Sequence, residues 1–386
     1  MQAPLTIIGT GMAGIGLARQ LRALGNDRPI TLITADSGDD YSKPLLSTGF
    51  AKRMPPQRLA MRSALEVADQ LGAVVRTRTR VDAIDTKAQQ LVIGEERLPW
   101  SDLVLATGAV PRPPFAIGSS LANRVFSIND LDDYRGFHAA LESLGRPARV
   151  AIVGLGLVGC EFANDLQAGG HQVTLVGPEQ ALLPRLLPEP LGLALGRVFV
   201  ASGIDVHYQR LVTRVDQQGA QATLILNDGQ QLQSDLVLVA TGLQPRTELA
   251  VAAGLEVGED GVKVNRRLTT SEAHVHALGD VACVDGINAM YVQPLQAAIR
   301  ALAATLDGKP TEVGYGAWPV LVKTPLLPVV SLPPAHDRVT WRIEADGEDM
   351  TALAEDELGQ LQGFALTGSC VRRKVELARA APPLLG

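Results

Sequence analysis

Two glycine-rich turns, each directly after a short apolar segment, limit what this chain can fold into more than any other feature. The first is GTGMAG at residues 9–14 after LTII at 5–8, and the second is GLGLVG at residues 154–159 after VAIV at 150–153. In such a turn the first glycine permits a tight bend, the second lets the backbone approach a pyrophosphate, and the third lets helix and strand pack closely. We therefore expect two strand–turn–helix units, each with a dinucleotide site where its helix begins.

The segments that follow the two turns also repeat. Apolar strands are indicated at residues 30–33 and 172–176, about one helix length after each turn. Each repeat then continues to a buried strand and an ATG turn, DLVLATG at 102–108 and DLVLVATG at 235–242. Strands that are joined through a helix pair in parallel. The sequence thus predicts an α/β fold with two Rossmann-type sheets.

Proline-bearing segments at residues 111–114 and 244–246 follow the two ATG turns and predict extended crossings between domains. The second unit is then inserted in the first. From about residue 312 the chain becomes short, proline-punctuated and β-rich, which indicates a small third domain of α+β type. The expected domains are 1–112 together with 243–311, then 113–242, and finally 312–386.

An acidic side chain at the end of the second strand of such a unit can accept hydrogen bonds from a ribose. Asp36 stands there in the first unit, 22 residues after Gly14. In the second unit the equivalent place is Gly177, and the nearest acid, Glu179, comes two residues late. Since no Lys or Arg lies between residues 176 and 183 to meet a 2′-phosphate, we expect NADH to be preferred over NADPH.

Composition excludes several other classes of protein. The 386 residues carry a net charge of -6, which argues against nonspecific nucleic-acid binding. No apolar run approaches the roughly 20 residues that cross a bilayer, and we expect neither a signal peptide nor membrane insertion, but a cytoplasmic protein. The 3 cysteines show no CxxC or Cys/His ligand spacing, and the pair His274 and His276 is an incomplete ligand set, so no metal is expected.

The motifs together resemble one family, the FAD/NAD-linked reductases of the glutathione-reductase superfamily. Beyond the glycine and ATG turns, the segment ALGD at 277–280 is similar to the family's second flavin motif. Four further segments resemble the branch of the family that reduces rubredoxin: YSKPLLSTG at 41–49, GCEFANDL at 159–166, YVQPL at 291–295 and VKTP at 322–325.

The resemblance implies FAD in the first unit, with Asp280 on its ribityl chain, and NADH in the second unit. Other branches of the family place redox cysteines in the first domain, but residues 41–50 contain none. Electrons would then leave the flavin directly for a one-electron carrier, for which we expect rubredoxin and, beyond it, an alkane hydroxylase. Ferredoxin-reducing relatives usually have an arginine near Lys43 and a lysine soon after the Leu-Ser pair, where this chain has Thr48.

Two alternatives remain. A reductase for ferredoxin or putidaredoxin is the nearest one, and turnover with purified carriers separates the two functions. The other is an NADH-responsive flavoprotein similar to apoptosis-inducing factor, which would reduce acceptors poorly and change its assembly state with NADH.

Glu161 and Lys323 are the expected catalytic residues. Lys323 is expected to lie in an otherwise apolar strand with residues 320–322, and a buried lysine needs a carboxylate or an anionic reduced flavin nearby. We expect its ammonium to lie within about 4 Å of the Glu161 carboxylate, beside the flavin. There is a structural alternative for each residue. Glu161 would only cap its helix, on the first turn, and Lys323 would be an exposed lysine on an edge strand. The expected cofactor-binding residues are Gly9, Gly11, Ala13, Gly14, Asp36, Lys43, Pro44, Val81, Thr107, Gly108, Gly154, Gly156, Val158, Gly159, Glu179, Gly242, Gly279, Asp280, Pro294, Leu295 and Lys323.

Two further groups have a structural interpretation beside a functional one. Cys160 and Cys283 flank nucleotide motifs without an adjacent base, and we expect small buried thiols. The basic run 372–374 with Arg379 is either a solvated helix face or a docking patch for an acidic carrier.

Overall fold

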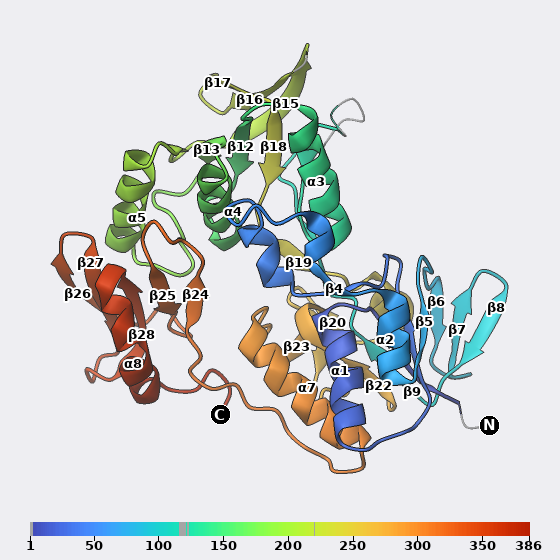
Figure 1. Cartoon of the computed structure of the whole chain (residues 1–386). Helices are drawn as coiled ribbons and strands as arrows, with labels where there is room; N and C mark the ends of the chain where they lie inside the picture. Colours follow the sequence, from blue (N-terminus) through green and yellow to red (C-terminus); the bar gives the residue numbers. More distant parts are fainter. Residues whose placement is uncertain (1–2, 116–120, 122, 220) are drawn as a thin grey trace.

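A five-stranded parallel sheet contains the strand before the first glycine turn. In the computed structural model, which describes residues 3–115, 121, 123–219 and 221–386, the strand β1 is buried at all four positions, as expected for a central parallel strand. Helices α1 (Met12–Ala23) and α7 (Val292–Leu306) pack against each other beside the sheet (Figure 1). The strand order is β22 (Val275–Ala277), β9 (Asp102–Leu105), β1 (Leu5–Ile8), β2 (Ile30–Ile33) and β5 (Val74–Arg76).

Smaller elements complete this part of the chain. An antiparallel meander leads into β9. A small three-stranded sheet takes two strands from before β22 and one from after it, and a 3-10 helix, η1 (Lys43–Thr48), lies after β2 in the chain. The meander consists of β6 (Ala83–Asp85), β7 (Gln90–Ile93) and β8 (Glu96–Pro99), and the small sheet of β20 (Val257–Gly258), β21 (Gly261–Val264) and β23 (Ala282–Val284). The remaining elements are β3 (Asp40–Tyr41), η2 (Pro56–Arg58), β4 (Ala60–Arg62), α2 (Ala64–Leu71), α6 (Glu248–Ala252) and η4 (Gly279–Val281).

A second parallel sheet is built around the strand before the second glycine turn. Helix α4 (Leu157–Ala168) begins at that turn, and α3 (Leu131–Ser143) and α5 (Glu189–Ala201) complete the helical cover (Figure 1). The strand order is β11 (Val125–Phe126), β18 (Leu236–Val239), β12 (Arg149–Val153), β13 (Gln172–Val176) and β14 (Asp205–His207). An antiparallel meander of β15 (Val212–Gln218), β16 (Gln221–Leu226) and β17 (Gln231–Ser234) packs on this sheet.

The two sheets are joined by a pair of antiparallel strands, β10 (Ala109–Pro111) and β19 (Leu243–Pro245). The chain leaves the first sheet after β9 and returns to it as β22, the neighbour of β9. Extended proline segments had been predicted at both places, because a proline fixes its own φ and keeps the preceding residue out of the helical region. We propose domain boundaries at this double crossing, with 113–242 inserted between 1–112 and 243–311.

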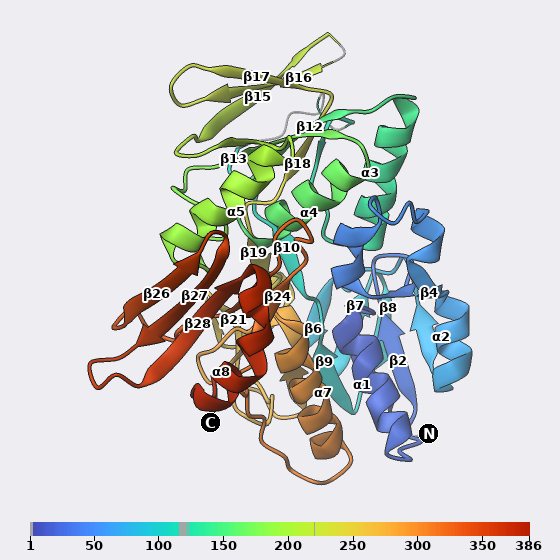
Figure 2. The same cartoon turned by 60° about the vertical axis from the view of Figure 1, so that its left-hand side comes forward.

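The last part of the chain forms a five-stranded antiparallel sheet. Its order is β24 (Val320–Val322), β25 (Val329–Leu332), β28 (Leu361–Thr367), β27 (Asp349–Glu355) and β26 (Thr340–Asp346). The sheet lies beside α5 of the second unit, as Figure 2 shows, and η5 (Gly368–Arg373) and α8 (Lys374–Ala380) follow it.

The hydrophobic cores explain how the three parts are held together. The first parallel sheet and its helices share one core. The core of the second unit also contains Leu46 and Phe50 from the first part, and Val322, Met350 and Ala352 from the last. This shared core fixes the positions of the three parts around α4. Within the described ranges, no helix is both long and apolar enough to cross a membrane.

Candidate functional site

The first glycine turn leaves no room for side chains where strand and helix cross. Gly9 has φ +119°, and a β-carbon there would lie 2.2 Å from the carbonyl oxygen of Ala106. A β-carbon on Gly14 would lie 2.0 Å from the carbonyl oxygen of Gly9, whereas one on Gly11 would meet open space. The three glycines therefore have the roles expected from the sequence. The first and third allow the close crossing of strand and helix, and the second leaves the backbone open to a ligand.

The second turn has the same geometry. Gly154 has φ +121°, and its β-carbon would lie 2.4 Å from the carbonyl oxygen of Ala240, while one on Gly159 would lie 2.2 Å from that of Gly154. A β-carbon on Gly156 would again meet open space. Both turns thus present an open backbone in front of a helix.

The helices that follow the turns begin without side-chain caps. Gly11 and Gly156 are the N-cap residues of α1 and α4, neither end has a capping side chain, and neither first turn contains an acidic residue. The N–H groups of a first helical turn have no partner within the helix, and the helix dipole is positive there. Two sites suited to a pyrophosphate result, one on each sheet.

Asp36 lies beside the first of these sites. Its Oδ1 accepts hydrogen bonds from Thr34 Oγ1 at 2.7 Å, the Gly38 N–H at 2.8 Å and Thr10 Oγ1 at 3.3 Å. Thr10 belongs to the glycine turn itself, so the carboxylate is held next to it. All three bonds go to one oxygen, and within the described part of the chain no donor reaches Oδ2, which leaves that oxygen available for ribose hydroxyls.

The Gly-Asp turn after β22 comes back to the same helix end. A β-carbon on Gly279, which has φ +81°, would lie 3.0 Å from the β-carbon of Ala13 and 3.7 Å from Leu295. The Asp280 carboxylate lies 4.0 Å from Lys43 Nζ, which also donates to Asn129 Oδ1 at 2.7 Å. Burial lowers the pKa of Lys43, although the charges of Asp280 and Asp130 oppose this. These contacts bring Ala13, Lys43, Gly279, Asp280 and Leu295 together, as expected.

The other expected cofactor residues lie near the two turns in different ways. Thr107 Oγ1 donates to the Arg246 carbonyl and the Gly108 carbonyl accepts from the Arg246 N–H, while Arg112 N–H donates to the Gly242 carbonyl, so these residues fix the crossing strands. Val81 is buried in the first core, just after a segment bonded to Asp36. Pro44, Val158 and Pro294 lie at the N-terminal ends of η1, α4 and α7.

Glu161 is the centre of the site. Its side chain is 5% exposed, and its Oε2 accepts a hydrogen bond from Ser47 Oγ at 2.8 Å and an ion-pair contact from Lys323 Nζ. Its Oε1 accepts the Lys323 backbone N–H at 3.0 Å. The expected pairing of Lys323 with Glu161 is therefore formed. Glu161 lies on the second turn of α4 and not the first, because the helix begins at Leu157, and Lys323 directly follows β24 instead of lying inside it.

Two more polar side chains on the same face of α4 extend this junction, and they were not singled out from the sequence. Asn164 Oδ1 accepts the Leu326 N–H at 3.1 Å. Asp165 accepts the N–H groups of Ala51 at 2.9 Å and Phe50 at 3.1 Å. Burial raises the pKa of Asp165 even though these N–H groups act to lower it. The i, i+3, i+4 spacing of 161, 164 and 165 marks one helix face, which is the sequence signal that could have found them.

The ribose position of the second unit differs from the first. Glu179 Oε2 is buried and has no hydrogen-bond partner in the described chain. This oxygen lies 2.5 Å from where a β-carbon on Gly177 would be, and Leu155 Cγ, from the glycine turn, lies 2.7 Å from the same point. The carboxylate thus folds back into the space left by the missing side chain of Gly177. The carboxylate of Glu179 thus reaches the position of residue 177, although Glu179 comes two residues later in the sequence.

The cysteines do not enter this site chemically. Cys160 is fully buried on α4, its Sγ donates to the Leu155 carbonyl, and burial strongly raises the pKa of its thiol. Burial also raises the pKa of Cys283. Both are buried thiols, as expected.

The two histidines of the late strand are also separated. His274 has φ +62°, precedes β22 and contacts Asp102 at 3.0 Å, so it does not alternate with His276 along a strand face. His276 is buried, which lowers its pKa. Among the described residues no cluster of three metal-ligating side chains occurs.

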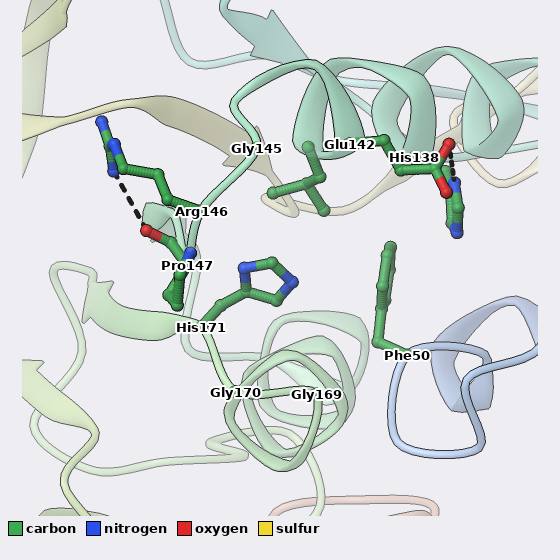
Figure 3. A pocket seen from close by; sticks show the side chains of 10 residues that line it. Phe50, His138, Glu142, Gly145, Arg146, Pro147, Gly169, Gly170 and His171 are labelled. Atoms are coloured by element: carbon green, nitrogen blue, oxygen red, sulfur yellow. Dashed lines mark hydrogen bonds and ion pairs between the residues drawn. The ribbon is translucent and has the colours of Figure 1, made fainter.

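A cavity of about 370 Å³ lies elsewhere on the second unit. Figure 3 shows Phe50, His138 and His171 around it, with the Phe50 ring stacked on His138 at a centroid distance of 5.6 Å. His171 precedes β13, and Pro147, also in the lining, precedes β12. The cavity is therefore at the edge of the sheet opposite the glycine turn, and we do not assign the reaction to it.

Known proteins agree with the class that this geometry defines. A family model, the pyridine nucleotide-disulphide oxidoreductases, matches residues 3–302. The chain belongs to the pyridine nucleotide-disulphide oxidoreductase family.

The last domain and the full-length relatives show a more specific similarity, to reductases of rubredoxin. A model described as a rubredoxin binding C-terminal domain matches residues 312–381. A rubredoxin-NAD(+) reductase of Alcanivorax borkumensis is 43% identical over 384 residues, which is 99% of both chains. The rubredoxin-NAD(+) reductase of Acinetobacter baylyi is 38% identical over 99% of this chain and 98% of its own.

A solved structure shows the same fold. The putidaredoxin reductase in its covalent complex with putidaredoxin superposes with a TM-score of 0.88 at 24% identity, covering 98% of this chain and 94% of the other. At this identity the match supports the arrangement of the domains and not the choice of carrier.

Proposed function

We propose that this protein oxidises NADH and passes the electrons, through a noncovalently bound FAD, one at a time to rubredoxin. The observation that carries the proposal is the contact of three parts of the chain at one carboxylate. Glu161, on the helix of the second glycine turn, accepts from Ser47 of the first unit and from Lys323, which lies within the segment similar to rubredoxin-binding domains.

The first unit suits a dinucleotide flavin better than a mononucleotide. Its uncapped helix end is placed to bind a pyrophosphate, and Asp36, whose Oδ2 is free of donors within the described chain, is placed to bind the ribose of an adenosine. Both contacts would be lost on FMN, which has neither a pyrophosphate nor an adenosine. FAD bound through such contacts needs no covalent link.

The second unit suits NADH. Its uncapped helix end repeats the pyrophosphate site, and the partly exposed Glu179 side chain, which reaches the position of residue 177, is placed to accept hydrogen bonds from the ribose. A 2′-phosphate at this place would meet the negative charge of Glu179. We therefore expect kcat/KM to be more than tenfold higher for NADH than for NADPH, since tenfold corresponds to about 1.4 kcal/mol.

FAD, when bound, supplies an acceptor for a hydride and a store from which single electrons leave. The residues of this chain bind, orient and balance charge around it. The Glu161 carboxylate holds the Lys323 ammonium at the junction of the three parts, and the ammonium, which has three N–H donors, keeps others for a partner with negative charge. The uncapped N-terminal end of helix α4 would hold the pyrophosphate of the nicotinamide cofactor, and Glu161 on the same helix would keep Lys323 close to it.

The carrier must accept single electrons directly. Residues 41–50 contain no cysteine and Cys160 and Cys283 are buried, so neither that segment nor these two thiols offer a sulfur relay. An iron–sulfur carrier takes one electron at a time, and two rubredoxins are reduced for each NADH. The onward acceptor that we propose is an alkane hydroxylase.

A second candidate is suggested by other relatives. A nitric oxide reductase FlRd-NAD(+) reductase of Vibrio vulnificus is 36% identical over 98% of both chains. This likeness makes the FlRd protein of a nitric oxide reductase an alternative acceptor for the same reductase chemistry.

The test is a stopped-flow experiment with the anaerobic, NADH-reduced holoprotein. Rubredoxin, ferredoxin and FlRd are mixed with it in separate runs at equal concentrations, and flavin reoxidation is followed. We expect rubredoxin to reoxidise the flavin at least tenfold faster than ferredoxin. Faster reoxidation by ferredoxin or FlRd would replace the carrier in the proposal, and slow reoxidation by all three, with a change of assembly state on adding NADH, would support a signalling flavoprotein.

A further inference from the structure

An arginine that is distant in sequence lies beside the adenosine-ribose position of the second unit. The segment that follows β14 runs along the segment that follows β13, because both strands end at the same edge of the parallel sheet. The Gly177 N–H donates to the His207 carbonyl at 3.1 Å, and the Arg210 N–H donates to the Gly177 carbonyl at 2.9 Å. The Gln209 N–H donates to the Glu179 carbonyl at 3.0 Å. The backbone of Arg210 is thus fixed against Gly177, and that of its neighbour Gln209 against Glu179.

The guanidinium of Arg210 forms an ion pair with Asp228. Its Nε lies 2.8 Å from Asp228 Oδ2, and both side chains are 39% exposed. Asp228 stands in the turn between β16 and β17, where its Oδ1 accepts the Gln230 N–H at 3.0 Å. The preceding residue ties this turn to the chain after Arg210, since the Asn227 N–H donates to the Leu211 carbonyl at 2.9 Å and Asn227 Oδ1 accepts the Leu211 N–H at 3.2 Å. The Asp228 carboxylate is therefore held in a position where it can pair with the Arg210 guanidinium.

We propose that Asp228 is a specificity-determining residue that keeps Arg210 from a 2′-phosphate and so helps to exclude NADPH. The inference rests on the proposed use of NADH. With Arg210 paired to Asp228, the ribose position presents only the acceptor Glu179 to an incoming nucleotide. A guanidinium is a bidentate phosphate ligand, and an arginine near the ribose position of a Rossmann unit can accommodate a 2′-phosphate. The chain thus carries a suitable arginine whose charge is satisfied by Asp228, a residue of the turn between β16 and β17.

Arg185 is another basic residue in the loop after β13. It interacts electrostatically with Tyr291 at the N-terminal end of α7. Burial raises the pKa of Tyr291, and the charge of Arg185 acts to lower it against this effect.

The test removes the acid without removing the turn. Asp228→Ser keeps an oxygen that can accept the Gln230 N–H, and serine is better than asparagine because an asparagine before Gly229 would deamidate back to aspartate. The matched control is Asp216→Ser on β15 of the same meander. Asp216 pairs with Arg214 at 2.8 Å, so the control releases another arginine and removes the same charge without touching residues 177–179.

Binding is measured first, with the FAD-loaded protein and two fragments, ADP-ribose and 2′,5′-ADP. Isothermal titration calorimetry gives their dissociation constants without any turnover. We expect Asp228→Ser to bind 2′,5′-ADP at least fivefold tighter than the wild type and to bind ADP-ribose within twofold of it. The double variant Arg210→Ala/Asp228→Ser should lose the gain, and Asp216→Ser should show none. The ratio of kcat/KM for NADPH to that for NADH should rise by the same factor.

The outcomes separate the inference from the proposed function. If the wild type binds no ADP-ribose, the use of NADH at this site is wrong and the inference falls with it. If ADP-ribose binds but Asp228→Ser leaves 2′,5′-ADP within twofold, Asp228 does not guard the site. An equal gain in Asp216→Ser would show a general charge effect and would also overturn the inference.

Discussion

Replacing Lys323 by alanine is the most direct perturbation of the junction between the three parts. The change leaves the Glu161 carboxylate, 5% exposed, without its counter-ion. Two hydrogen bonds remain, from Ser47 Oγ at 2.8 Å and from the backbone N–H of residue 323 at 3.0 Å. The carboxylate is therefore partly satisfied but carries an uncompensated charge.

The expected loss of stability follows from this geometry. Removing one partner of a fully buried ion pair costs about 3–5 kcal/mol. The Lys323 side chain is 32% exposed, which weakens the pair by solvent screening, and the two hydrogen bonds remain. We therefore expect Lys323→Ala to lower the free energy of unfolding by about 1–3 kcal/mol. Glu161→Gln should cost less, about 1 kcal/mol, because the amide oxygen can still accept the Lys323 N–H, the amide NH2 group can donate to Ser47 Oγ, and the free ammonium can reach water.

The functional effect is a slower transfer from NADH to the flavin. We expect Lys323→Ala to reduce the rate of anaerobic flavin reduction by at least about fivefold, which corresponds to about 1 kcal/mol in the barrier, while FAD stays bound. Lys323→Arg, which restores the charge, should recover part of the rate. Lys374→Ala is the control, because it removes a lysine of the same domain that has no contact with Glu161.

Chemical denaturation and stopped-flow reduction measure the two effects on the same samples. A reduction rate within twofold of the wild type would remove Lys323 from the chemistry and leave the last domain with a docking or structural role. A larger loss of stability in Glu161→Gln than in Lys323→Ala would refute the argument from burial.

Three other predictions follow from single features of the structure. Acid precipitation should release all flavin as free FAD, and FMN, or flavin retained in the pellet, would show that the first unit is misassigned. Gly177→Ala should raise the KM for NADH by about tenfold, about 1.4 kcal/mol, with FAD content unchanged, because the new methyl group would lie 2.5 Å from Glu179 Oε2; an unchanged KM would mean that this carboxylate does not bind the ribose. The Arg146 guanidinium lowers the pKa of Asp235, and the N–H of Arg149 adds to this effect while burial opposes it. The Asp235 carboxylate therefore stabilises the fold above about pH 4, and this contribution disappears as the pH falls through the depressed pKa. Asp235→Asn should accordingly be less stable than the wild type by about 1–3 kcal/mol at pH 7, and equilibrium unfolding should show this difference shrinking below about pH 4, whereas a constant difference would contradict the linkage.

Local sequence determined the two nucleotide-binding units. The strands expected at 5–8, 30–33 and 172–176 are found with these bounds, and both glycine turns have the predicted close crossings. These features depend on interactions within about ten residues, namely apolar runs that must be buried and glycine conformations that other residues rarely adopt. The absence of cysteine from residues 41–50 was also visible directly.

The tertiary structure decided which side chains meet. Glu161 and Lys323 are 162 positions apart, and the sequence could suggest their pairing only from charge in an apolar setting and from the resemblance to a family. The return of the Glu179 carboxylate to Gly177 and the place of Arg210 beside them depend on how the segments after β13 and β14 run along each other. Pattern and spacing contain no information on such contacts, because a parallel sheet brings strand ends together across an intervening helix whose length does not set which side chains face the ligand.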